Sequence, residues 1–297
     1  MSTEYTREDL IEFRPRHSKL MAIDSDGCVF GTMDVKQKNH FHPLIVEKWG
    51  LQEIESRVRQ VAEFINLYSV DRGSNRFLAL LKTFRMLEQW PEVAQTGVRL
   101  PSTAALAAYC DSGLPLGNPS LESEVVRTGD LELARVLDWS LAVNRDIDAN
   151  MEPVEPFEWA LRALRKMQGG ADMIVVSQTP EEALVKEWNQ HGLDGYVSVI
   201  AGQELGTKGE HLALVSKDRY DGESILMVGD APGDIRAAAE VGGWFYPINP
   251  RGEEDSWRRL CEQDYERFLR GDFDREYQEE LIAAYKELLP TRPPWLD

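Results

Sequence analysis

The segment Leu20–Phe30 decides the fold class and reads Leu-Met-Ala-Ile-Asp-Ser-Asp-Gly-Cys-Val-Phe. Four apolar residues run directly into Asp24, and a second carboxylate, Asp26, follows two positions later. An apolar run this short predicts a buried parallel strand. Open α/β sheets bind ligands at the carboxyl ends of their strands, so we expect both carboxylates at that edge. Charge is costly in such a place unless a cation or a reaction needs it.

The chain beyond residue 156 alternates between strand and helix patterns. We expect strands over 173–176, 196–201, 224–228 and 244–248, and helices over 157–167, 180–191, 209–216 and 234–241. This alternation predicts a parallel sheet with right-handed crossovers. The fold class is therefore α/β, with a discontinuous core made of residues 1–30 and 156–250.

Residues 31–155 show helical periodicity and almost no strand pattern, which predicts an all-helical insertion. We expect helices over 42–68, 76–90, 101–109, 122–127 and 130–150. Pro91 should end the second of these helices, and Asp130 should be the N-cap of the last. The apolar pattern of residues 251–297 predicts two more helices, with a break between them near Gly271. Their tryptophan and tyrosine content indicates an extension packed on the core.

The composition bounds the class of protein. The chain has 297 residues, 42% of them hydrophobic, and a net charge of −18. An acidic chain without an evident basic patch is not expected to bind nucleic acid. No apolar run approaches the ~20 residues that span a bilayer, and the first residues lack an apolar signal core, so we expect a cytoplasmic protein and no membrane. The three cysteines are far apart and predict reduced thiols.

Four separated sites fall at the predicted strand ends or in the loops after them: Asp24 with Asp26, Ser177, Lys208, and Asp230 with Asp234. Each one alone is more often a turn, a helix cap or a surface residue. Together they fit phosphoryl transfer through an aspartyl phosphate.

Each site has a role in that chemistry. Asp24 and Asp230 offer the hard oxygen ligands that Mg²⁺ takes beside phosphate. Lys208 can pair with phosphate, and Ser177 can offer it a hydroxyl and backbone N–H groups. Asp26 can protonate the leaving alkoxide and later activate water.

The motifs resemble those of the haloacid dehalogenase (HAD) superfamily. The residues Asp24-Ser25-Asp26-Gly27-Cys28-Val29 resemble the family's first motif, and Met173–Ser177 resembles its second. Lys208 in Thr207-Lys208-Gly209 resembles the family's third motif, and Val228–Asp234 resembles its fourth. All occur in the family's order and cover residues 18–30 and 157–248.

The resemblance implies a Rossmann-like core and an enzyme that uses Mg²⁺. By position, Asp24 would be the nucleophile and a metal ligand. Asp26 would be the general acid and base, with its carbonyl also on the metal. Ser177 and Lys208 would hold phosphate, Asp230 would ligate the metal, and Asp234 would support it. The insertion corresponds to a cap that closes over the site and selects the substrate.

Cys28 departs from the family, which usually has threonine there; this puts the local turn geometry in question more than the chemistry. Asp26 favours phosphate chemistry, because dehalogenating members lack a carboxylate at that position. In the insertion, Arg72, Asn75 and Arg76 are candidates for contact with anionic substrate groups. A plain helix connection with Ser74 as N-cap is the favoured explanation of that segment.

The sequence thus predicts a Mg²⁺-dependent hydrolase of a small phosphorylated metabolite. Two alternatives stay open: a phosphomutase of the same superfamily, and a non-catalytic binding protein on the same core. The substrate and the oligomeric state are not specified.

Overall fold

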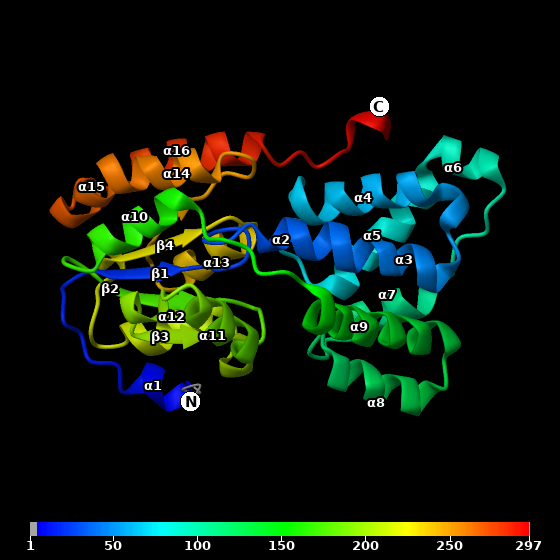
Figure 1. Ribbon diagram of the computed structural model, residues 1–297, viewed down its shortest axis with the longest axis horizontal. Coiled ribbons are helices and arrows are strands. Elements are labelled where there is room, and N and C mark those ends of the chain that lie inside the picture. The colour runs from blue at the N-terminus through cyan, green and yellow to red at the C-terminus, as the bar shows by residue number, and fades with distance from the viewer. Residues whose placement is uncertain (1–4, 297) are drawn as a thin grey trace. The chain divides into compact units, whose positions relative to one another are not determined.

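The computed structural model describes residues 5–296 and contains one five-stranded parallel sheet (Figure 1). Its order is β3-β2-β1-β4-β5. The strands are β1 (Leu20–Ile23), β2 (Asp172–Val176), β3 (Val199–Ala201), β4 (Ile225–Gly229) and β5 (Trp244–Pro247). In register, Ile23 of β1 lies between Val175 and Val228, so the central strands end together. The predicted α/β, Rossmann-like parallel sheet is confirmed.

Alternate residues of β1 serve two apolar cores. Met21 and Ile23 face one core, and Leu20 and Ala22 face the other. The first core includes side chains of α10 (Glu158–Met167), α11 (Glu181–Gln190) and α14 (Glu253–Arg259). The second includes side chains of α1 (Arg7–Ile11), α12 (Lys208–Ser216) and α13 (Pro232–Glu240). Figure 1 shows α10 and α14 along one side of the sheet and α12 along the other. Burial on both faces explains why the strands are continuously apolar.

The extension after β5 contains the expected helices and the expected break. The helix α14 continues through a π-helical turn, Leu260–Asp264, into α15 (Tyr265–Arg270). Gly271 has φ 79°, a left-handed conformation that ends α15. The following helix, α16 (Arg275–Glu287), covers the edge strand β5: the Gln278 side chain accepts a hydrogen bond of 2.7 Å from Phe245 N. A covered edge cannot pair with another strand.

The insertion is helical, as predicted, and has its own apolar core built around Trp139, Phe77 and Phe84. Its helices are α2 (Thr32–Val35), α3 (His42–Trp49), α4 (Glu55–Leu67), α5 (Arg76–Gln89), α6 (Pro91–Thr96), α7 (Ala104–Cys110), α8 (Asn118–Thr128) and α9 (Leu131–Asn150), with a π-helical turn over Lys36–Phe41. The Asp130 side chain caps α9 by accepting from Glu132 N and Leu133 N.

The predicted single helix over 42–68 is wrong. Gly50 has φ 64° and ends α3, and a short 3₁₀ turn, Gln52–Ile54, precedes α4. Apolar residues of both helices belong to the same core. The predicted strand over 196–201 is also shorter, because a 3₁₀ turn, Asp194–Tyr196, comes before β3.

The chain divides into two compact units. One joins residues 5–33 to Pro153–Leu288, and the other joins Asp34–Glu152 to residues 289–296. The expectation that all of 251–297 packs on the core is therefore wrong for its last residues. The Trp295 ring lies 5.5 Å from the Phe64 ring and 5.4 Å from the Trp90 ring, so it packs with aromatic residues of the insertion. Within residues 5–296, no helix is both long and apolar enough to cross a membrane.

Candidate active site

The site lies at the carboxyl ends of the central strands. Asp24 follows β1, and its backbone N–H donates to Val228 O of β4 at 2.9 Å. Asp230 follows β4, and Lys208 begins α12, where Thr207 caps the helix through Glu210 N. Parallel strands thus bring together residues that are about 200 positions apart, as the sequence predicts.

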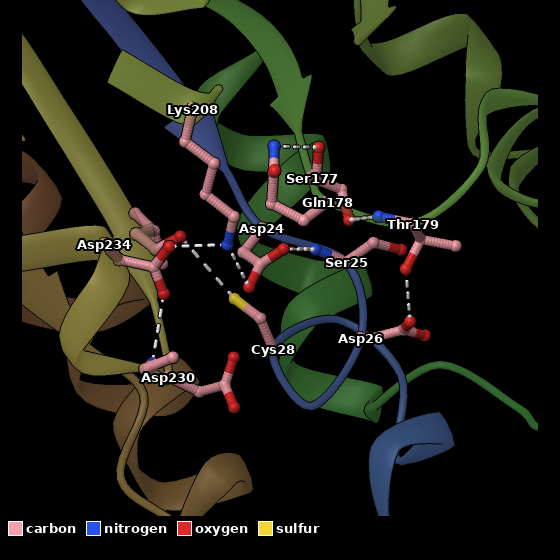
Figure 2. Close-up of polar contacts among 12 residues, drawn as sticks. Asp24, Ser25, Asp26, Cys28, Ser177, Gln178, Thr179, Lys208, Asp230 and Asp234 are labelled. Atoms are coloured by element: carbon pink, nitrogen blue, oxygen red, sulfur yellow. Dashed lines mark hydrogen bonds and ion pairs between the residues drawn. The ribbon is translucent and has the colours of Figure 1, made fainter. Parts of the chain in front are cut away.

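Lys208 joins two of the carboxylates (Figure 2). Its Nζ lies 2.7 Å from Asp24 Oδ2 and 2.6 Å from Asp234 Oδ1. The second oxygen of Asp24 accepts from Ser25 N at 2.8 Å, and the second oxygen of Asp234 accepts from Ala231 N at 3.0 Å. Every one of these contacts is buried or partly buried, so the ammonium and the carboxylates have fixed orientations.

Asp230 completes an acidic cluster. Asp24, Asp230 and Asp234 are all buried, and each offers a carboxylate oxygen within 4.8 Å of the other two. Three carboxyl groups thus lie together in a buried place that holds one ammonium, that of Lys208. A hard divalent cation such as Mg²⁺ fits this donor set, since it takes carboxylate oxygens together with phosphate oxygens and water.

Burial sets the electrostatics of the cluster. The pKa of Asp24 is well above its usual value, because desolvation disfavours the carboxylate; the charge of Lys208 opposes this shift, while Asp234 and Asp230 add to it. The pKa of Lys208 is raised even though burial itself lowers it, because Asp234 and Asp24 stabilise the ammonium. Lys208 is therefore a permanent cation at this site.

Asp26 is turned away from this cluster, toward two threonines. Its Oδ2 accepts from Thr179 Oγ1 at 2.6 Å, and its Oδ1 accepts from Thr32 Oγ1. Figure 2 shows the Asp26 carboxylate directed at Thr179 and away from Lys208. The side chain of Asp26 is not part of the acidic cluster; its carbonyl remains a proposed metal ligand.

Ser177 lies where the sequence places it, directly after β2. It is buried, its N–H donates to Ala201 O, and its Oγ accepts from Thr179 N at 3.2 Å. The helix α11 has Pro180 at its N-cap position without a side-chain cap, so Ser177 does not cap it. In its contact with Thr179 N the Ser177 hydroxyl is the acceptor, so this bond does not use its proton.

Cys28, which stands where the resembled family usually has threonine, makes a hydrogen bond to β4. Its thiol is fully buried and donates to Val228 O at 3.7 Å, which is the role open to a hydroxyl at this position. Burial raises the pKa of the thiol well above its usual value, and Asp24 and Asp230 add to the shift. Cys28 is thus a neutral structural thiol that links the first loop to β4.

The three candidates in the insertion have partners inside the helical unit. Arg72 donates to Leu67 O at 2.8 Å, and Arg76 donates to Ser140 and Asn144. Asn75, and not Ser74, is the N-cap of α5, where its side chain accepts from Phe77 N. Contact of these residues with a substrate remains a proposal.

Sequence reasoning did not assign the contacts that four residues make with the site. Thr32 and Thr179 hold Asp26, whereas Trp257 and Tyr285 of the extension reach backbone carbonyls of two site loops. The threonines carry a weak signal, since both lie within six residues of a predicted site residue. The aromatic residues carry none, because their contacts span more than 50 positions and depend on packing.

The proteins found to be similar to this chain are proteins of known structure. A haloacid dehalogenase-like hydrolase from Bacteroides fragilis has a TM-score of 0.48 and 14% identity, over 81% of this chain and 93% of its own. A predicted phosphoglycolate phosphatase from Haemophilus somnus has a TM-score of 0.47 and 13% identity, over 82% and 96%. A HAD hydrolase from Bacillus subtilis bound to magnesium has a TM-score of 0.43 and 13% identity, over 77% and 86%. No family model and no curated protein matches the sequence.

Proposed function

We propose that this protein is a Mg²⁺-dependent phosphatase that cleaves a phosphate monoester of a small molecule through an aspartyl phosphate on Asp24. The observation that carries the proposal is the ammonium of Lys208 held between Asp24 and Asp234, beside Asp230. A structural ion pair needs one carboxylate, whereas phosphoryl transfer needs a nucleophile, a fixed cation and ligands for a metal.

Asp24 and Asp230 would hold the metal, with Asp234 in support and the Asp26 carbonyl as a further ligand. The bound ion would neutralise charge on the phosphoryl group. The other parts of the reaction can be assigned to the chain's own residues.

In the first step an Asp24 oxygen attacks phosphorus, and the bond from phosphorus to the ester oxygen breaks. The leaving oxygen takes a proton from Asp26. Ser177 donates its hydroxyl proton to a phosphoryl oxygen, and Lys208 pairs with the same group. In this structure both carboxyl oxygens of Asp26 accept hydrogen bonds, one from Thr32 and one from Thr179. For this step Asp26 must therefore break one of these bonds and form a hydrogen bond to the leaving oxygen.

In the second step Asp26 removes a proton from water, and the water oxygen attacks phosphorus. The bond from phosphorus to Asp24 breaks, which releases inorganic phosphate and restores the carboxylate. The same carboxyl thus serves as acid and then as base, as the reversal of proton transfer requires.

The test is release of inorganic phosphate from a panel of phosphomonoesters with Mg²⁺. We expect the full chain to release phosphate and Asp24→Asn to lose turnover while it still folds. Asp264→Asn is the control, because Asp264 is also a buried aspartate of the same unit but lies outside the cluster. A hydroxylamine-sensitive phosphoprotein should form in the wild type and not in Asp24→Asn.

Three results would contradict the proposal. Wild-type turnover in Asp24→Asn would show that Asp24 is not the nucleophile. An isomerised phosphate product without free phosphate would assign a mutase. No release from any ester, together with no binding of Mg²⁺ and fluoride as a phosphate mimic, would assign a binding protein.

A further inference from the structure

The C-terminal extension contacts both acidic loops of the site. From the extension, the indole Nε1 of Trp257 donates to Cys28 O at 2.7 Å, and the hydroxyl of Tyr285 donates to Asp230 O at 2.8 Å. Cys28 belongs to the loop that carries Asp24 and Asp26. Two aromatic residues of one extension thus reach the loop after β1 and the loop after β4.

Both contacts are deep in the protein. Trp257 and Tyr285 have 0% exposed surface, and the Asp230 residue is equally inaccessible. The Tyr285 ring packs against Phe245 of β5, with ring centroids 6.0 Å apart. A buried hydrogen bond of this kind fixes its acceptor, because a carbonyl that loses its donor cannot turn to water instead.

The first loop depends on such bonds for its shape. It turns sharply at Gly27, which has φ 80°, and Ser25 O accepts from the N–H groups of Cys28, Val29 and Phe30. The Trp257 bond adds a constraint from outside the loop. The fourth loop is similarly constrained, since Tyr285 holds the peptide carbonyl of the residue whose carboxylate belongs to the acidic cluster.

We propose that Tyr285 and Trp257 are positioning residues: Tyr285 sets the metal affinity of the Asp230 loop, and Trp257 sets the orientation of the Asp24–Asp26 loop. This inference rests on the proposed function, because it assigns effects on the same Mg²⁺ site. The extension is therefore part of the active site's support and not only a cover for the edge strand.

The experiment measures Mg²⁺ binding by calorimetry and steady-state kinetics on the full chain. We expect Tyr285→Phe, which removes one hydroxyl and keeps the ring, to raise the Kd for Mg²⁺ about 10-fold, the size of effect typical of groups that orient metal ligands. Its kcat at saturating Mg²⁺ should stay close to wild type, since bound metal fixes the loop again. Trp257→Phe should lower kcat about 10-fold at saturating Mg²⁺, because it misplaces the nucleophile and the acid.

Two matched controls separate positioning from general loss of stability. Tyr246→Phe removes a buried hydroxyl that donates to Ser256 O, and Tyr277→Phe removes a hydroxyl of α16 that donates to Asp264. Neither hydroxyl bonds to a site loop, so the Kd for Mg²⁺ and kcat should stay within about twofold of wild type.

The outcomes distinguish this inference from the proposed function. If the wild type binds Mg²⁺ and the Kd of Tyr285→Phe lies within twofold of the wild-type Kd, the role of Tyr285 is refuted while the phosphatase proposal stands. An equal rise in Kd in Tyr246→Phe would also refute it, because the effect would then be a loss of stability. Failure of the wild type to bind Mg²⁺ would overturn both proposals. Trp257→Phe tests the extension independently of Tyr285, and wild-type kcat in that variant would refute the role of Trp257.

Discussion

Replacing Lys208 with methionine should destabilise the protein strongly in the absence of Mg²⁺. Lys208 Nζ lies 2.7 Å from Asp24 Oδ2 and 2.6 Å from Asp234 Oδ1, and its side chain is only 12% exposed. Removing one partner of a buried ion pair leaves charge without compensation and costs about 3–5 kcal/mol. For a unit of this size, that loss lowers Tm by on the order of 10 °C.

The pH dependence of this loss has a definite sign. Burial holds the pKa of Asp24 above 3.8 in the folded protein, and Lys208 is the main group that opposes the shift. Without Lys208 the folded pKa of Asp24 rises further. The folded state then binds the proton more tightly than the unfolded state, so stability falls as pH rises from about 3.8 to the folded pKa. The deficit of Lys208→Met should therefore be larger at pH 8 than at pH 5.

The assay is urea unfolding followed by tryptophan fluorescence, in EDTA, at pH 5, 6.5 and 8. Lys166→Met is the control: Lys166 Nζ lies 3.1 Å from Glu266 Oε1 in the same unit, but the two side chains are 34% and 43% exposed. A pair exposed to this extent contributes about 0–1 kcal/mol. A loss below 1 kcal/mol in Lys208→Met at pH 8, or a loss that grows toward pH 5, would refute the electrostatic account of the cluster.

Three further substitutions test other parts of the site. Asp26→Ala should spare Mg²⁺ binding and lower kcat by about 10²–10⁴, since it removes only the acid and base; calorimetry showing lost Mg²⁺ binding would contradict that role. Gly229→Ala would place a Cβ 2.3 Å from Asp234 Oδ2, so we expect a destabilisation of about 1–3 kcal/mol and weaker Mg²⁺ binding, and an unaltered Kd would show that Asp234 does not support the metal. Asn75→Ala should cost about 1 kcal/mol of stability through the lost N-cap of α5 and leave KM unchanged, whereas a KM raised tenfold would assign Asn75 to substrate contact.

The approach of Asp24, Asp230 and Lys208 to one another can be predicted from the sequence, because it follows from the sheet. Asp24 and Asp230 stand directly after apolar runs, and parallel strands end at a common edge. Any residue in those positions must approach the others, whatever the details of packing. Lys208 is predicted for the same reason, since the loop after β3 leads to the same edge.

Errors in the predicted fold arise where the chain turns within an apolar pattern. The periodicity of 42–68 continues through Gly50, and only the packing of the helical unit requires a left-handed residue there. Trp295 fits the apolar pattern of the extension, yet it packs with Phe64 and Trp90 of the insertion. Apolar periodicity indicates that one face of a helix is buried, but it does not indicate which segment packs against that face.

By itself the sequence determines the parallel α/β core, the inserted helical unit and the meeting of carboxylates and lysine at one sheet edge. These features depend on local patterns and on a topology that has few alternatives. Only the tertiary structure decides that Asp26 points to Thr32 and Thr179, that Cys28 bonds to β4, and that Trp257 and Tyr285 hold the two acidic loops. Those contacts depend on side-chain directions and on close approach between distant segments, which apolar periodicity does not specify.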